Sequence, residues 1–361
     1  MSKRVIVAMS GGVDSAVAAG LLVGEGYDVV GITMRLWTRD DDAGRLHQNR
    51  CCGVEDVDDA RAAADVLGIP HYTLNLEAEF NRKVVDYFVA EYERGRTPNP
   101  CLACNEHVKF RALLDRAVAL DADYLSTGHY ARVYHGEAGS ELHRAVDDSK
   151  DQSYVLYTLQ QAELRRLLFP VGHYPKTEIR NLALEMGLPV HDKPDSAEIC
   201  FVPGNDYRAF LAERIAQRPG DIVDHEGAVV GSHEGVAGFT IGQRKGIGAF
   251  GGKRFVTEID PELNVITIGA EEDLLARRLW TEAPSWVDGE PPGETFEAMV
   301  KVRYKSPPAA ARVRLTEDGL DIEFEQPLRA VTPGQAAVLY AGERVIGGAT
   351  ISRTEAGVVS L

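Results

Sequence analysis

The sequence predicts an α/β fold, with a Rossmann-like parallel-sheet domain followed by a small central β-rich domain and a C-terminal β-barrel. Three observations carry this prediction. Strand-like and helix-like segments alternate over roughly the first two hundred residues. A glycine-rich turn joins the first strand to the first helix, and short strands separated by Gly and Pro dominate the second half.

In the first domain, expected over residues 1–204, short apolar runs alternate with longer segments of helical periodicity. The expected strands are 4–9, 29–36, 71–76 and 124–127. The expected helices are 14–24, 55–67, 79–93, 108–120 and 176–186. Such alternation places helices on both faces of a parallel sheet.

The pattern changes after about residue 204. A central domain over 205–278 is expected to hold a helix at 207–217 and extended segments at 221–230, 238–241, 254–258 and 265–269. The C-terminal domain, 279–361, shows strand signals at 295–303, 310–315, 320–324, 336–340 and 344–351. Regularly spaced short strands are typical of small barrels and sandwiches.

The net charge of −16 excludes a general nucleic-acid coat, because phosphates would be repelled by most of the surface. Two stretches without acidic residues, 239–257 and 298–316, are candidate phosphate-binding islands. Their cations are Arg244, Lys245, Lys253, Arg254, Lys301, Arg303, Lys305, Arg312 and Arg314. The alternative is that these cations lie on solvated strand faces.

The cysteine count and the N-terminus indicate a cytoplasmic enzyme. Five cysteines in 361 residues do not suggest a secreted disulfide framework. No apolar run is long enough for a membrane span, and the N-terminus does not resemble a signal peptide. We expect no membrane partner and a monomeric chain.

The turn Ser10–Ser15, SGGVDS, has the features of a phosphate-binding loop. Its glycines allow close approach of the backbone to an anion, and the following helix start offers N–H groups and a positive dipole end. Asp14 is suited to hold Mg²⁺ beside the phosphates. The loop lacks the lysine of a Walker A motif and the spacing of a dinucleotide fingerprint. The alternative is a capped strand–helix turn with no ligand.

Two cysteine segments are the second candidate site. Cys101 and Cys104 form a CxxC before an expected helix, whose N-terminus would stabilise a thiolate at Cys104. Cys200 follows a loop far downstream. The alternatives are structural zinc for the CxxC and a small buried apolar role for Cys200.

SGGVDS resembles the loop of the ATP pyrophosphatase (PP-loop, adenine nucleotide α-hydrolase-like) superfamily, whose members adenylate a carbonyl oxygen. The whole set of motifs resembles the bacterial tRNA-specific 2-thiouridylases (MnmA type). These motifs are AMSGGVDS (8–15), TPNPCLACNEHVKF (97–110), TGHYA (127–131), KDQSY (150–154), SAEICFV (196–202) and GQRKG (242–246). The segment with Cys51 and Cys52 also matches, and we expect a structural role for that pair.

The resemblance implies ATP- and Mg²⁺-dependent adenylation of the C2 carbonyl of the wobble uridine in tRNA, followed by replacement of that oxygen by sulfur. It makes Cys200 the persulfide carrier and Cys104 the nucleophile that releases the sulfur. The sulfur would come from a cysteine desulfurase, directly or through relay proteins.

The resemblance also assigns binding residues. The nucleotide would contact Ala8, Met9, Ser10, Gly11, Gly12, Val13, Asp14, Ser15, Met34 and Gly128. The tRNA would contact Asn99, Pro100, Cys101, His129, Lys150, Asp151, Gln152, Arg303, Tyr304 and Gln335. The alternatives are a core position on the second strand for Met34 and, for His129, a loop histidine whose hydrogen bonds are satisfied within the protein.

Cys101 departs from the family pattern, since many members carry Asp there. Cys101, Cys104 and Cys200 together resemble the ligand set of iron–sulfur tRNA thiolases, so a [4Fe–4S] cluster is expected as a second route for sulfur, with zinc as a third occupant.

Two other function classes remain open at this point. Another PP-loop ligase or synthetase acting on a small molecule would explain SGGVDS but not the three cysteines or the basic islands. A non-enzymatic RNA- or metal-binding protein would leave the phosphate loop without a role. Pyrophosphate release from ATP that depends on tRNA is expected for the thiolase alone.

Overall fold

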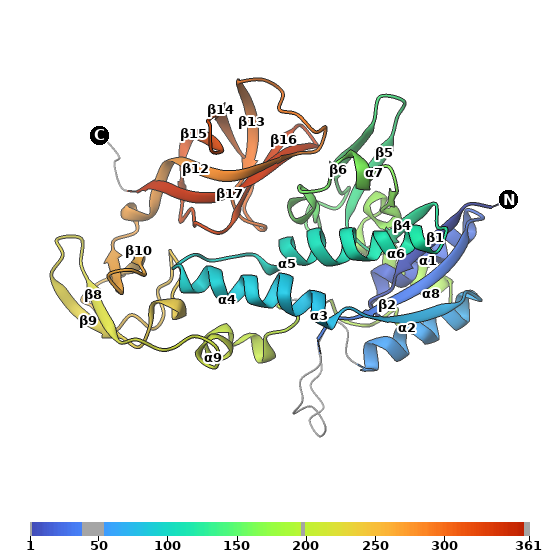
Figure 1. Cartoon of the computed structure of the whole chain (residues 1–361), viewed down its shortest axis with the longest axis horizontal. Helices are drawn as coiled ribbons and strands as arrows, with labels where there is room; N and C mark the ends of the chain where they lie inside the picture. The colour runs from blue at the N-terminus through green and yellow to red at the C-terminus, as the bar shows by residue number, and fades with distance from the viewer. Residues whose placement is uncertain (1, 38–53, 196–198, 357–361) are drawn as a thin grey trace.

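The computed structural model describes residues 2–37, 54–195 and 199–356 and contains three sheets (Figure 1). Cys51 and Cys52 lie outside the described residues. No described helix is long and apolar enough to cross a membrane.

The first sheet is parallel throughout, with the order β3-β2-β1-β4-β7. Its strands are β1 (Arg4–Ala8), β2 (Asp28–Arg35), β3 (His71–Asn75), β4 (Tyr124–Thr127) and β7 (Leu167–Leu168). The expected parallel sheet is confirmed, and β7 is an addition that is too short for periodicity to detect.

Alternate residues of β1 face two apolar clusters. Val5 and Val7 pack on one side with α1 (Val13–Gly24), α2 (Val54–Leu67) and α8 (Lys176–Glu185). Ile6 and Ala8 pack on the other with α4 (Asp86–Glu93) and with the helical run α5 (Pro100–Ala103), η2 (Cys104–Ala112) and α6 (Leu113–Ala119). Both faces of the sheet are therefore covered by helices, which is the two-sided arrangement expected for parallel strands.

Two parts of this domain differ from the sequence prediction. The helical run that contains the CxxC begins at Pro100, eight residues earlier than expected, because Asn99 caps it by accepting a hydrogen bond from the Cys101 N–H at 3.1 Å. The hairpin of β5 (Ala131–His135) and β6 (Ser140–Arg144) was not predicted.

The helix expected at 79–93 agrees with the structure. It is a continuous helical run formed by α3 (Glu77–Phe80), η1 (Asn81–Val85) and α4.

The central domain has a four-stranded sheet with the order β10-β11-β8-β9. The segment expected as one strand at 221–230 is a hairpin, β8 (Gly220–Val223) and β9 (Val229–His233), because Asp224 and Gly227 form a tight turn between them. The strand expected at 238–241 is wrong, since a short 3₁₀ turn, Val236–Gly238, leads there into a loop. Helix α9 (Tyr207–Ala212) is shorter than expected, and β10 (Phe255–Asp260) and β11 (Val265–Gly269) lie close to the expected ranges.

The C-terminal domain is a closed six-stranded barrel, which confirms the predicted architecture. Its strands follow the order β12-β15-β14-β13-β16-β17, and β12 pairs with β17 to close it. They are β12 (Leu275–Trp286), β13 (Thr295–Lys301), β14 (Ala309–Leu315), β15 (Leu320–Arg329), β16 (Ala336–Ala341) and β17 (Arg344–Ala356). Strand β12 crosses the boundary expected between residues 278 and 279.

All three domains meet at the segment that precedes α5. The Thr97 N–H donates to the Pro333 carbonyl at 2.9 Å, and Gln335 Nε2 donates to the Thr97 carbonyl at 2.7 Å, so the barrel holds this segment from one side. Thr97 Oγ1 lies 3.3 Å from Thr240 Oγ1 of the central domain. The CxxC therefore starts where the domains converge.

Candidate active site

The loop Ser10–Ser15 lies at the carboxyl end of β1 and opens helix α1. Gly11 has a φ of +72°, and a Cβ there would collide with the Asp56 carbonyl oxygen, so only glycine fits. Gly12 occupies the N-cap position of α1, and no side chain of the described residues caps this helix. Ser15 Oγ accepts from the Ser10 N–H and donates to the Gly12 carbonyl, both at 3.1 Å. The turn is thus fixed while the first N–H groups of α1 remain available to an anion.

The segment that follows β4 packs directly against this loop. A Cβ on Gly128 would lie 2.6 Å from the Ser15 nitrogen, which leaves no room for a side chain. The Tyr130 hydroxyl donates to Asp14 Oδ1 at 2.7 Å. Burial, together with the negative charge of Asp14, raises the pKa of Tyr130, so the hydroxyl keeps its proton.

Two lysines from distant parts of the chain reach the loop. Lys176 Nζ, at the start of α8, lies 2.6 and 2.8 Å from the two carboxylate oxygens of Asp14. Lys193 Nζ donates to the Gly11 carbonyl at 3.0 Å and pairs with Asp56 and Asp59. Neither lysine can be recognised as a site residue from the sequence, because both are more than 150 residues from SGGVDS and carry no local motif.

Asp195 is the last residue of the described segment 54–195, and it connects to the phosphate loop through Lys176. It pairs with Lys176 at 2.9 Å, with Lys150 at 2.8 Å and with Arg180 at 3.0 Å. Burial would raise the pKa of Asp195, but the ion pairs with Lys150 and Lys176 outweigh burial and lower the pKa to about 2. Lys150, expected at the tRNA, is therefore tied to the phosphate-loop network.

Three residues expected to contact tRNA have internal partners in the structure, and their contacts with tRNA remain predictions. His129 is 7% exposed and lies against Phe110 and Phe169, and burial lowers the pKa of its ring well below the usual value, so the ring is neutral. The Asp151 carboxylate is fully buried and accepts from Ala145, Ser153 and Arg144. Gln152 accepts from the Tyr130 N–H at 2.9 Å. The side chains of His129, Asp151 and Gln152 thus have internal partners.

Met34 lies on β2 within the same apolar cluster as Ile6 and Ala8 and is 7% exposed. Its expected contact with the nucleotide remains a prediction.

The two cysteines of the CxxC lie in different surroundings. Cys101 is exposed in the first turn of the helical run, whereas Cys104 is buried in the apolar cluster that covers this face of the sheet. Because the helix begins at Pro100, the Cys104 N–H already donates to the carbonyls of Pro100 and Cys101. The first-turn position expected for Cys104 is therefore held by Cys101.

Cys200 packs against the same apolar cluster that contains Cys104. The next residue, Phe201, is 2% exposed, and its ring contacts Phe80, Phe88 and Phe210 with centroid separations of 5.7, 5.3 and 5.4 Å. These aromatic contacts fix the chain at Cys200 to α3, α4 and α9.

The expected iron–sulfur cluster is not supported by this arrangement. Within residues 2–37, 54–195 and 199–356, no three His, Cys, Asp or Glu side chains are placed so that they could hold a metal ion. Cys101, Cys104 and Cys200 do not fit a cluster as they lie here, whereas the Asp14 carboxylate is the kind of hard oxygen ligand that Mg²⁺ prefers.

The two basic islands differ in how their charges are used. In the second, Lys301 is buried beside Asp151, Arg303 donates to the Ala330 carbonyl and to Thr332 Oγ1, and Arg314 pairs with Asp321. These three cations have partners within the protein, and the expected contact of Arg303 with tRNA remains a prediction.

In the first island, all four cations are exposed, and none has an ion pair among the described residues. Arg244 and Arg254 line a hollow of about 160 Å³ together with Gly248 and Gly252. This island remains a phosphate-binding candidate.

Tyr304 of the barrel lies near the CxxC. Burial, with the negative charges of Asp151 and Cys101, raises the pKa of Tyr304 to about 12. Gln335, as described above, holds Thr97. Both residues therefore lie near the segment at which a target base is expected, and their contacts with tRNA remain predictions.

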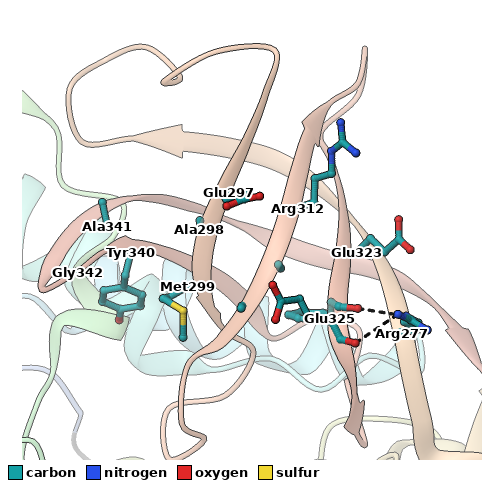
Figure 2. A pocket seen from close by; sticks show the side chains of 13 residues that line it. Arg277, Glu297, Ala298, Met299, Arg312, Glu323, Glu325, Tyr340, Ala341 and Gly342 are labelled. Carbon is teal, nitrogen blue, oxygen red and sulfur yellow. Dashed lines mark hydrogen bonds between the residues drawn. The ribbon is translucent and has the colours of Figure 1, made fainter.

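A larger hollow of about 560 Å³ lies on the barrel, and none of its lining residues comes from the parallel-sheet domain (Figure 2). Arg277 borders it and donates to the carbonyls of Phe324 and Glu325, both at 3.3 Å. Its charged rim carries both signs, from Arg277, Arg312, Glu297, Glu323 and Glu325. This hollow includes no residue of the phosphate loop and none of the cysteines.

Three family models match the chain in order. They are described as a tRNA methyl transferase HUP domain (residues 3–204), a tRNA methyl transferase PRC-barrel domain (208–270) and an aminomethyltransferase beta-barrel domain (276–351).

Relatives match over nearly the full length. The tRNA-specific 2-thiouridylase MnmA of Carboxydothermus hydrogenoformans is 49% identical over 359 residues, covering 97% of this chain and 98% of the relative. The protein of the same name from Chloroflexus aurantiacus is 49% identical over 357 residues, covering 98% and 99%. A solved 4-thiouridine synthetase–RNA complex with bound ATP matches with a TM-score of 0.35 and 19% identity, covering 58% of this chain and 50% of that one.

Proposed function

The chain belongs to the family of tRNA-specific 2-thiouridylases, and on this premise we propose that it uses ATP to replace the C2 oxygen of a wobble uridine in tRNA by sulfur. The observation that carries the proposal is the pairing of two sites in one domain. An anion-binding loop lies at the carboxyl end of β1, and two cysteines share one apolar cluster on the face of the same sheet. Two of the family-model descriptions mention methyl transfer, but the loop and the cysteines fit the thiolation named for the relatives.

The loop would bind the triphosphate of ATP. The N–H groups at the start of α1 and the exposed hydroxyl of Ser10 would face the anion, while Ser15 holds the turn and Asp14 would hold Mg²⁺ beside it. The C2 oxygen of the uridine attacks the α-phosphorus, the bond to the bridging oxygen of the β-phosphate breaks, and pyrophosphate leaves. AMP bound to the base is then a good leaving group.

The cysteines would deliver sulfur in two steps. The terminal sulfur of a persulfide on Cys200 attacks C2, and AMP leaves. The Cys104 thiolate then attacks the Cys200 sulfur, which breaks the S–S bond, leaves sulfur on C2 and forms a Cys104–Cys200 disulfide. A thiol reductant regenerates both thiols, and a sulfur donor reloads Cys200.

The persulfide route does not require Cys101, whereas an iron–sulfur cluster held by three cysteines would require it. We expect the Cys101→Ser variant to form thiouridine and the purified chain to work without iron, because the persulfide scheme uses only Cys104 and Cys200. Iron and sulfide analysis after anaerobic reconstitution is the measurement. Bound iron that is lost in the Cys101→Ser variant together with activity would favour the cluster.

The exposed island at 239–257 would bind the phosphate backbone of tRNA. Its four cations have no ion-pair partner among the described residues, and Arg244 and Arg254 share one hollow. Replacing both arginines by alanine should lower the slope of log K against log salt by roughly one to two. Arg314→Ala is the matched control, because Arg314 is paired with Asp321 and should leave the slope unchanged.

The reaction itself is tested by pyrophosphate release and by mass spectrometry of tRNA nucleosides. Pyrophosphate should appear only with both ATP and a tRNA that carries a wobble uridine, and 2-thiouridine should appear only when a sulfur donor is also present. Pyrophosphate formed without tRNA would point instead to a small-molecule ligase.

A further inference from the structure

The phosphate loop contains no cation of its own. Residues Ser10–Ser15 include one acid, Asp14, and no lysine or arginine. The triphosphate of ATP carries several negative charges, and loops of the Walker type meet them with a lysine inside the motif. Backbone N–H groups and one Mg²⁺ leave part of this charge uncompensated, so a cation from elsewhere in the fold is required.

Lys176 is placed to supply it. Its ammonium lies within 2.8 Å of both Asp14 carboxylate oxygens and 5.6 Å from the centre of the Tyr130 ring. The side chain is 10% exposed, so its position is determined by its neighbours rather than by solvent. A ligand at the N-terminus of α1 would lie beside Asp14, the second residue of that helix, and so beside this ammonium.

The charges around Lys176 are balanced until a metal ion binds. Three cations, Lys150, Lys176 and Arg180, lie among three carboxylates, Asp14, Asp147 and Asp195. When Mg²⁺ occupies Asp14, its two positive charges leave this cluster with a cationic surplus that suits an anion.

Lys193 is the natural comparison. It also reaches the loop, but it pairs with two carboxylates, Asp56 at 2.8 Å and Asp59 at 2.5 Å. Its charge is already compensated, and its bond to the Gly11 carbonyl stabilises the turn.

We propose that Lys176 is the phosphate-binding cation of the loop, contributed by helix α8, and that its ammonium turns from the Asp14 carboxylate to the phosphates of ATP when Mg²⁺ binds Asp14. Asp195 and Tyr130 hold the side chain in place until then. The inference rests on the proposed function only in taking ATP as the nucleotide.

The test is calorimetric titration of the full chain with ATP and with AMP, each in the presence of Mg²⁺ and without tRNA. We expect Lys176→Met to weaken ATP binding by roughly ten- to a hundredfold, since a charge-assisted hydrogen bond is lost, and to change AMP binding less than about twofold. Lys176→Arg keeps the charge and should show a smaller loss.

Asp195→Asn separates phosphate binding from a structural role, because it removes a partner of Lys176 and keeps the ammonium. We expect its ATP affinity to equal or exceed that of the parent chain. Equal losses for ATP and AMP in Lys176→Met, or a loss in Asp195→Asn as large as that in Lys176→Met, would overturn the proposal. If the parent chain binds ATP but makes no thiouridine, the proposed function fails, and the assignment of Lys176 is still decided by these titrations.

Discussion

The two halves of the candidate active site are held by different forces. Around the phosphate loop, Asp14, Lys176 and Asp195 form a network of ion pairs, with Tyr130 as an additional donor. Around the cysteines, Cys104 is buried in an apolar cluster, and Phe201 anchors the chain at Cys200 through ring contacts. The phosphate end should therefore respond to charge and pH, and the sulfur end to side-chain volume.

The largest expected effect is a loss of thiolation in cysteine variants that still bind ATP. It tests whether the phosphate loop and the cysteines act independently. Cys104→Ser and Cys200→Ser should each lower thiolation by roughly three orders of magnitude or more, because each removes a group that acts chemically. ATP affinity should change less than about twofold, since both cysteines belong to the apolar cluster on the face of the sheet opposite α1. Nucleoside mass spectrometry and calorimetry give the two readouts. A loss of ATP binding in the same variants would show that the phosphate loop depends on the cysteines.

The aromatic anchor of Cys200 is tested by Phe201→Ala. Removing a ring that is 2% exposed should cost about 3–5 kcal/mol of unfolding free energy and speed alkylation of Cys200. Phe324→Ala in the barrel core, at a site 1% exposed, should cost a similar amount and leave that alkylation rate unchanged. Equal alkylation rates in the two variants would mean that Phe201 does not position Cys200.

Close packing at the phosphate end is tested by Gly128→Ala. The new methyl group would lie 2.6 Å from the Ser15 nitrogen, so the loop must shift at a cost of about 1–3 kcal/mol, and ATP affinity should fall. Gly24→Ala is the control, because nothing lies within 4 Å of a Cβ at that exposed helix position. Unchanged ATP binding in Gly128→Ala, measured by calorimetry, would contradict the described contact.

The smallest effect concerns pH. Asp195 has a lowered pKa, so its ion pairs contribute stability above its ordinary pKa near 4, and that stability is lost as the pH falls toward about 2. The contribution should not exceed about 1 kcal/mol, because the pair is partly exposed to solvent. Denaturant unfolding between pH 4 and pH 2 should show a weaker pH dependence for Asp195→Asn than for the parent chain. Identical slopes would remove Asp195 from the network.

The features that could be predicted are those whose residues are neighbours in the sequence. The parallel sheet follows from alternating apolar runs, and SGGVDS indicates an anion site within six residues. Lys176 could not be found in this way, because only the packing of α8 against α1 brings it to Asp14. A lysine at the start of an amphipathic helix is too common to signal a site.

Charge patterns along the chain were a weaker guide, as the two basic islands show. Both lack acids in sequence, yet Arg314 pairs with Asp321 across neighbouring strands, while Arg244 remains exposed. His129 and Asp151 likewise lie in the interior, which their motifs in the sequence do not reveal. The sequence shows which stretches are rich in cations. Strand pairing in the folded chain determines which of these cations already have a carboxylate partner.

The most direct test of the account is a single turnover with Cys200 loaded as a persulfide, in which 2-thiouridine, pyrophosphate and disulfide are measured together. We predict one thiouridine and one pyrophosphate per loaded chain, with a Cys104–Cys200 disulfide formed in equal amount. Thiouridine formed without ATP, or without that disulfide, would contradict the account.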